Sequence, residues 1–268
     1  MIFKPFFLLV LPLLGIASPS SFVPAAPANL HVHNHGKDTA IPRGKITKIN
    51  GVDTYVTLPR ATFQRNTALV FLTDIFGLPL LENKLLVDQW ADAGFATYAP
   101  DYLNGDAITD VGDIPTWILR HGEAQTTPPL LAVLDGLRGR GVTKLAVTGY
   151  CFGGLYTTRL AQNNSITVGS MSHPSLLTIP DDFEVILQQS HVPIEINNSD
   201  EDTTLTPELA LEIDAVLGGG AYKPGYARRE FAGVGHGFAV SADPADPVQV
   251  AAKKGAFDTT LKFFRAHL

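Results

Sequence analysis

The chain has 268 residues, of which 45% are hydrophobic and 17% charged, and this composition is typical of a globular protein rather than a disordered or fibrous one. A formal net charge of −6 argues against a nucleic-acid-binding function, because that function usually requires a basic face. The chain contains a single cysteine, Cys151, so no disulfide can form within it.

The first 34 residues are expected to lie outside the folded domain. Lys4 precedes an apolar run over residues 6–16, and small residues follow, which is the three-part pattern of a secretory signal peptide. We therefore predict a signal peptide over residues 1–17, a disordered leader over residues 18–34, and secretion of the protein. The run is shorter than the roughly 20 apolar residues of a membrane span, so we expect no stable span after cleavage. An uncleaved anchor is the alternative.

Secretion affects how other features are interpreted. A lone thiol kept in an oxidising compartment suggests a protected or a functional cysteine.

Two Asn-x-Ser motifs could accept glycans. Asn163 follows a predicted helix and is a plausible site, whereas Asn197 ends a predicted strand and is expected to be unused. His31, His33 and His35 alternate in the chain and could hold a transition metal. They lack a carboxylate or a fixed scaffold, and we favour a solvated leader without metal.

Apolar periodicity predicts strands that alternate with helices. Strands are expected at residues 45–49, 52–58, 67–72, 95–99, 144–147, 167–171, 192–196 and 226–231. Helices are expected at residues 80–93, 129–137, 155–162, 207–217 and 248–267. Residues 103–124 are irregular and form either a cap with short helices or a plain surface loop. The alternation predicts an α/β fold with a mostly parallel central sheet flanked by helices, in one domain over residues 35–268.

The stretch around Cys151 predicts a nucleophile elbow. Gly149, Gly153 and Gly154 flank the cysteine between a strand and a helix. Small neighbours allow the sharp, strained turn that lifts a side chain above the sheet. The N-terminus of the following helix favours a thiolate and later an oxyanion. The alternative is a buried structural cysteine in a glycine-rich turn.

A thiol nucleophile needs a base within reach, and the base needs an orienting carboxylate. In this architecture the chain order is nucleophile, acid, histidine. His236 lies in a glycine-rich loop after the last predicted strand, at the edge of the sheet where the base is required. His173 follows a strand at the same edge, but the acid would then come after the base. We therefore predict His236 as the base.

Three acidic residues, Asp200, Glu201 and Asp202, follow the strand at residues 192–196 and qualify by position as the orienting acid. At most one of them can orient the histidine, and we prefer Asp202, mainly because of a resemblance to a known family. The expected chemistry is acyl transfer, in which the thiolate attacks an ester carbonyl and the resulting acyl-enzyme is hydrolysed. The backbone N–H groups of Phe152 and Ile75 would form the oxyanion hole.

These residues resemble the dienelactone hydrolase family of α/β-hydrolases, and its fungal branch most closely. The motifs that carry the resemblance, over about residues 35–268, are His35-Gly36 with Pro42-Arg43-Gly44, Asp74-Ile75-Phe76-Gly77, Pro100-Asp101, Gly149-Tyr150-Cys151-Phe152-Gly153-Gly154, Asp202 with its following helix, and Gly235-His236-Gly237-Phe238. The resemblance implies an α/β-hydrolase fold, a Cys151–His236–Asp202 triad, and hydrolysis of small lactones or esters without a cofactor.

Two departures from the family pattern bear on the substrate. The bacterial members carry a Glu where this chain has Asp74, and that Glu bonds the resting thiol until substrate binds. Asp74 is therefore expected to gate the thiol or to line the substrate pocket. The arginines that hold the dienelactone carboxylate have no counterpart in residues 100–105, which suggests another natural substrate.

Two alternatives remain at this stage. One is a thioesterase or acyltransferase that uses the same triad, and the other is a non-catalytic secreted ligand-binding protein on the same fold. We expect a monomer whose partner is a small ester or lactone, without metal or nucleic acid.

Overall fold

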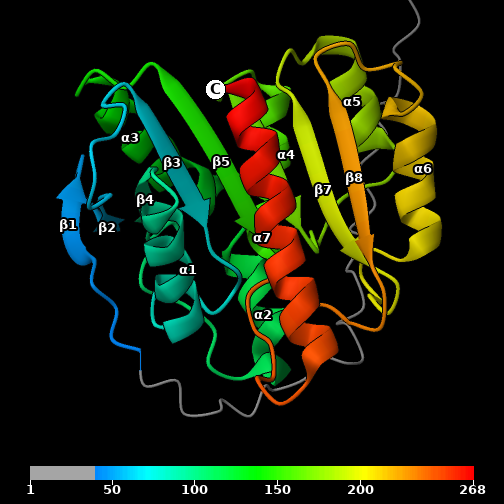
Figure 1. Ribbon diagram of the computed structural model, residues 1–268, viewed down its shortest axis with the longest axis horizontal. Coiled ribbons are helices and arrows are strands. Elements are labelled where there is room, and N and C mark those ends of the chain that lie inside the picture. The colour runs from blue at the N-terminus through cyan, green and yellow to red at the C-terminus, as the bar shows by residue number, and fades with distance from the viewer. Residues whose placement is uncertain (1–39) are drawn as a thin grey trace, which may run out of the picture.

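The computed structural model describes residues 40–268 (Figure 1), so the predicted signal peptide and leader, with His31, His33 and His35, lie outside the described residues. In the described part, one sheet has the strand order β1-β2-β4-β3-β5-β6-β7-β8. The strands are β1 (Lys45–Ile49), β2 (Val52–Thr57), β3 (Thr67–Leu72), β4 (Ala96–Pro100), β5 (Lys144–Tyr150), β6 (Val168–Ser172), β7 (Ile194–Ser199) and β8 (Tyr226–Phe231). β2 pairs antiparallel with β1 and β4, and the remaining pairs are parallel.

Helices cover both faces of the sheet. They are α1 (Leu81–Asp92), α2 (Ile114–Trp117), α3 (Glu123–Arg138), α4 (Phe152–Gln162), α5 (Asp181–Gln189), α6 (Pro207–Leu217) and α7 (Pro247–His267), with one-turn helices η1 (Val111–Asp113) and η2 (Ile118–Arg120). α1 and α7 lie in front of the sheet in Figure 1, and α3 and α4 lie behind it. This layering confirms the predicted α/β class and the mostly parallel sheet.

β3 shows how one strand builds both hydrophobic cores. Val70 and Leu72 join the core with the apolar residues of α3 to α6, and Leu69 and Phe71 join the core with those of α1 and α7. Trp90 on α1 is fully buried in this second core. Because successive side chains of a strand point to opposite faces, an uninterrupted apolar run is what a strand covered on both faces requires.

Several elements begin or end away from their predicted bounds. α3 begins at Glu123 instead of residue 129, with Pro128 and Pro129 inside it. Proline lacks the N–H that would bond to the carbonyl four residues earlier. For Pro129 that carbonyl belongs to Gln125, and the side-chain amide of Asn104 donates to it at 3.1 Å instead. A tertiary contact thus satisfies a group that the helix leaves unpaired.

Two further differences concern the second half of the chain. α5 was not predicted, although acidic residues occupy its first turn and Phe183 and Ile186 bury one face of it. β7 continues past residue 196 through Asn197 and Asn198, which are both fully buried. Asn197 is held by the hydroxyls of Thr259 and Thr260 on α7 at 3.0 Å each, so polar residues can continue the strand.

Candidate active site

Cys151 lies in the turn between β5 and α4, at the carboxyl edge of the sheet. Its backbone has φ 51° and ψ −113°, a conformation that is costly for a residue other than glycine. The Cys151 carbonyl accepts hydrogen bonds from the N–H groups of Gly154 at 2.9 Å and Ser175 at 3.1 Å. α4 begins directly after the cysteine, so the positive end of the helix dipole lies beside it. The predicted strained strand-to-helix turn is confirmed.

Two glycines let this turn pack closely against its neighbours. A Cβ atom on Gly153 would lie 2.4 Å from the carbonyl oxygen of Leu72, and one on Gly154 would lie 2.5 Å from the Cβ atom of Pro174. Both distances are far shorter than a van der Waals contact. Any larger residue would therefore push the turn away from β3 or from the loop after β6.

His236 and Asp202 meet from two separate loops, one after β8 and one after β7. The Nδ1 atom of His236 lies 2.9 Å from Oδ2 of Asp202 and 3.1 Å from Oδ1. The same carboxylate accepts a hydrogen bond from the N–H of Thr204 at 2.7 Å. Asp200 instead accepts from the N–H of Gly233 at 2.8 Å, and thereby anchors the histidine loop. Of the three neighbouring acids, Asp202 is the one bonded to His236.

The pKa values of His236 and Asp202 are shifted by the charges around them. Burial alone would lower the pKa of His236, but the charge of Cys151 and hydrogen bonds to Asp202 and Cys151 outweigh it and hold that pKa well above its ordinary value. Burial acts to raise the pKa of Asp202, yet the hydrogen bond and charge of His236 prevail and lower it. His236 is thus stabilised as an imidazolium between two acidic side chains.

Asp74 follows β3 and is buried close enough to His236 for their charges to interact. Its Oδ1 atom accepts hydrogen bonds from Asn83 Nδ2 at 2.9 Å and from the N–H of Phe76 at 3.1 Å. Burial raises the pKa of Asp74 to about 6, against the lowering effect of these bonds and of His236. These hydrogen bonds hold the carboxylate toward its own loop and α1.

The two residues predicted to supply oxyanion donors lie in the same buried cluster as Cys151. Phe152 is the first residue of α4, and Ile75 lies in the loop after β3. That loop is fixed from two sides. The hydroxyl of Tyr102 donates to the Thr73 carbonyl at 2.5 Å, and the N–H of Ile108 donates to the Ile75 carbonyl at 2.9 Å. Neither bond uses the N–H of Ile75.

The segment over residues 103–124 packs onto the elbow. Trp117 is fully buried, stacks on His121 with ring centroids 3.8 Å apart, and meets Phe152 edge-on at 5.1 Å. Tyr102, just before the segment, stacks on Phe152 from another side at 6.1 Å. The short helices η1, α2 and η2 therefore form a packed cap rather than a plain surface loop.

Two residues beside the site were not among the predicted site residues. The hydroxyl of Ser175 lies 3.5 Å from the Cys151 sulfur. The ring of His173, which was weighed as the base, meets the ring of His236 edge-on with centroids 4.9 Å apart. The available signal was the sequence His173-Pro174-Ser175, which directly follows β6 at the edge of the sheet that carries Cys151.

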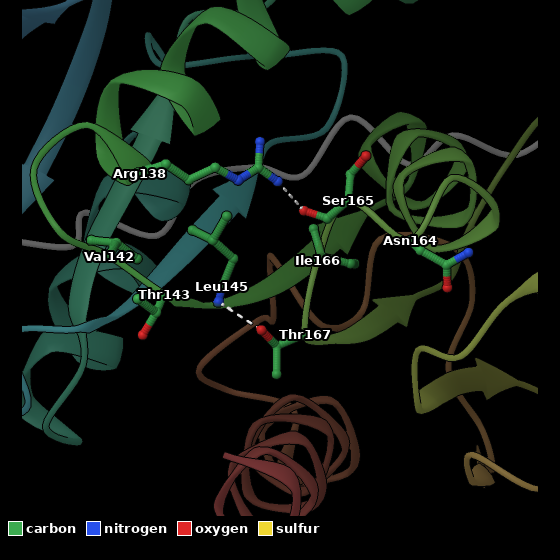
Figure 2. Close-up of a pocket in the computed structure, with 8 residues that line it drawn as sticks. All are labelled: Arg138, Val142, Thr143, Leu145, Asn164, Ser165, Ile166 and Thr167. Carbon is green, nitrogen blue, oxygen red and sulfur yellow. Dashed lines mark hydrogen bonds between the residues drawn. The ribbon is translucent and has the colours of Figure 1, made fainter.

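The groove in Figure 2 lies at the opposite end of the sheet. It is lined by Arg138, Val142, Thr143, Leu145, Asn164, Ser165, Ile166 and Thr167. These residues lie at the ends of α3 and α4 and at or just before the starts of β5 and β6, whereas Cys151 follows the end of β5. A strand of that length spans on the order of 20 Å, so this groove is not part of the candidate site.

Residues 40–268 contain neither a metal-binding cluster nor a membrane-spanning helix. No group of three or more His, Cys, Asp and Glu side chains in this range is arranged to hold a metal ion. In the same range, no helix combines the length and the apolar composition that crossing a bilayer requires. The alternating histidines of the leader lie outside these residues.

Comparisons with known proteins agree on one family. The sequence profile of the dienelactone hydrolase family matches residues 52–268. The hydrolase pyvD of Aspergillus violaceofuscus is 31% identical over 231 residues, which cover 84% of this chain and 91% of that protein. Dienlactone hydrolase 1 of Gibberella moniliformis is 28% identical over 229 residues, covering 81% and 85%. A dienelactone hydrolase-like promiscuous phosphotriesterase from metagenomic libraries shares the fold, with a TM-score of 0.66, 19% identity and coverage of 84% and 97%.

Proposed function

Because the chain belongs to the dienelactone hydrolase family and is a carboxylic ester hydrolase, we propose that it hydrolyses small esters or lactones with a Cys151–His236–Asp202 triad. The observation that carries the proposal is the position of His236. Its Nδ1 atom is bonded to the Asp202 carboxylate at 2.9 Å, and the Cys151 sulfur acts on the same ring and raises its pKa. A base held between an acid and a thiol is what thiol activation requires.

Before substrate binds, the thiol proton of Cys151 has passed to Nε2 of His236, and in the first half of the reaction the thiolate attacks the carbonyl carbon. A C–S bond forms, and the carbonyl electron pair moves onto oxygen. When this tetrahedral intermediate collapses, the C–O bond to the leaving group breaks and His236 protonates the alkoxide. For a lactone, the same step opens the ring and leaves the alcohol attached to the acyl group.

In the second half, His236 removes a proton from water, and the hydroxide attacks the thioester carbonyl. The C–S bond breaks, the carboxylic acid leaves, and the sulfur is released as a thiolate beside the His236 imidazolium. Asp202 keeps its charge throughout and stabilises the imidazolium in each half. In both tetrahedral intermediates the N–H groups of Phe152 and Ile75 would bind the oxyanion. The loss of one such donor costs ~3 kcal/mol of activation free energy.

The surroundings of the sulfur favour a small substrate. Cys151 is 8% exposed, and the aromatic residues Tyr102, Trp117 and Phe152 pack together beside it. A thioesterase or acyltransferase would share the first half of this reaction and differ in the leaving group or the acceptor. A panel of small lactones, oxygen esters and thioesters, each assayed with and without an added alcohol acceptor, would separate these activities.

The test uses p-nitrophenyl acetate and the single cysteine of the chain. Iodoacetamide should abolish turnover, and Cys151→Ala should do the same with an unchanged far-ultraviolet circular dichroism spectrum. His236→Ala should lower turnover by roughly 10²- to 10⁴-fold and raise the pH at which the thiol becomes reactive toward alkylation. His191→Ala, at an exposed histidine in the loop before β7, is the matched control and should leave both unchanged. Turnover that survives complete alkylation would rule out Cys151 as the nucleophile.

We also propose that the enzyme is secreted as a monomer, with the signal peptide cleaved near Ala17. The n-, h- and c-region pattern supports secretion, and the Asn-x-Ser motifs offer an internal check. Asn163 is exposed at the end of α4, whereas Asn197 is fully buried in β7. In a eukaryotic host we expect enzyme in the medium, with a glycosidase-sensitive mass that Asn163→Gln removes. Enzyme retained in the cell pellet with Met1 intact would contradict secretion, and gel filtration would test the monomer.

A further inference from the structure

Ser175 lies against the proposed nucleophile. Its Oγ atom is 3.5 Å from the Cys151 Sγ atom, a hydrogen-bonding distance for an atom as large as sulfur. Both residues are buried: Cys151 is 8% exposed and Ser175 is 9% exposed. In such surroundings few water molecules can compete for the sulfur, so one hydroxyl has a larger effect than it would at the surface.

The position of Ser175 is fixed by its backbone and its neighbours. Its N–H donates to the Cys151 carbonyl at 3.1 Å, and two residues earlier the N–H of His173 donates to the Asn197 carbonyl at 2.8 Å. Between them, Pro174 packs so closely on Gly154 that no Cβ atom would fit there. The loop after β6 is thus held on the turn around Cys151, and these contacts keep the Ser175 hydroxyl beside the sulfur.

Asp74, which was expected to gate the thiol or to line the substrate pocket, forms its hydrogen bonds with other groups. Its Oδ1 atom accepts from Asn83 and from the N–H of Phe76. Within residues 40–268, the side chains bonded to the sulfur are the Ser175 hydroxyl and the His236 ring, and neither is a carboxylate.

We propose that Ser175 is a further catalytic residue, whose hydroxyl donates a hydrogen bond to the Cys151 thiolate in the resting enzyme. This inference rests on the proposed function, in which Cys151 is the nucleophile. The hydroxyl keeps its proton, and no covalent bond to Ser175 forms or breaks. The hydrogen bond weakens when the sulfur loses its negative charge to the new C–S bond. Ser175 thus raises the thiolate fraction at a given pH and moderates its intrinsic nucleophilicity.

The decisive experiment is the rate of iodoacetamide alkylation of the single cysteine against pH, in the full chain and in Ser175→Ala. Loss of the donor should move the midpoint of the profile upward by about one pH unit, while the plateau rate at high pH stays equal or rises. kcat/KM for p-nitrophenyl acetate should fall about tenfold near neutral pH and recover as the pH increases. A role in folding alone would lower the amount of native protein and leave the midpoint in place.

Two variants serve as controls. Ser175→Thr keeps a hydroxyl and should restore the wild-type midpoint. Ser172→Ala removes a buried hydroxyl three residues earlier, whose bonding partner is Asn197, and should leave the midpoint unchanged. If Ser175→Ala titrates like wild type while alkylation still abolishes turnover, the role of Ser175 is refuted and the proposed triad stands. If turnover survives alkylation, the triad and the role of Ser175 both fall.

Discussion

Replacing Asp74 by Asn should stabilise the folded protein at neutral pH. Asp74 is a buried carboxylate whose Oδ1 atom accepts hydrogen bonds from Asn83 and from the N–H of Phe76. Asparagine has the same shape and keeps an Oδ1 acceptor for both donors. The substitution therefore removes a buried charge without removing the contacts that hold the loop after β3.

The magnitude follows from the protonation equilibrium. Burial raises the pKa of Asp74 from its ordinary value of 3.8 to about 6. The unfolded chain thus releases this proton at lower pH than the folded protein, so the group makes folding less favourable as pH rises from about 4 to about 6. Since a tenfold change in this equilibrium corresponds to about 1.4 kcal/mol, the full difference is about 3 kcal/mol. Relaxation around the charge makes this an upper bound, and we expect a gain of about 1–3 kcal/mol above pH 6.

Urea unfolding of both proteins at pH 7 and at pH 4 measures this difference. Asp74→Asn should gain stability at pH 7 and match wild type to within about 0.6 kcal/mol at pH 4, where the wild-type carboxyl is protonated in the folded state and a little under half protonated in the unfolded state. Glu212→Gln, at an exposed position of α6, is the matched control and should change stability at neither pH. An equal gain at both pH values, or a loss at pH 7, would refute the reasoning, because neither follows from a buried charge with a raised pKa.

Three further substitutions test the site and its support. Asp202→Asn keeps the shape of the acid but not its charge, so turnover should fall by at least about 10²-fold, and the pKa of His236, followed by NMR titration, should fall with it. Gly153→Ala would place a Cβ atom 2.4 Å from the Leu72 carbonyl oxygen, and we expect a loss of ~2 kcal/mol or more in urea unfolding, with reduced turnover. Trp117→Ala should cost about 3–5 kcal/mol in the same assay, because it empties a fully buried position of the cap where it packs on Phe152. Wild-type stability for either of the last two variants would contradict the packing described for the elbow.

The elements that could be predicted from sequence are those whose signals are local. β3 has its predicted bounds because its apolar run is uninterrupted, and α6 begins at Pro207 because Thr206 caps it, accepting from the N–H of Leu209. Cys151 and His236 could be placed at one edge of the sheet because each follows the carboxyl end of a strand. Chain order then narrowed the acid to three neighbours, and the family resemblance favoured Asp202 among them.

What could not be predicted depends on partners that are remote in the sequence. The early start of α3 requires the Asn104 amide to satisfy a carbonyl that the prolines leave open. The continuation of β7 through Asn197 requires hydroxyls from Thr259 and Thr260 on α7, which lie 62 and 63 residues later in the chain. The contact between Ser175 and the sulfur requires the loop after β6 to be fastened to the elbow. No periodicity or turn signal reports such pairings.

The identity of the side chain beside the sulfur determines how the resting thiol behaves. A carboxylate at hydrogen-bonding distance disfavours a thiolate by like-charge repulsion, so it keeps the sulfur protonated and unreactive until it moves away. A hydroxyl that donates to the sulfur has the opposite effect, because it stabilises the negative charge together with the imidazolium of His236. Asp74 is held by Asn83 and Ser175 is fastened beside Cys151, so under the proposed role of Ser175 a hydroxyl donor stabilises the resting sulfur and no carboxylate keeps it protonated. Protection from oxidation must then come from burial rather than from protonation, which is consistent with a cysteine that is only 8% exposed.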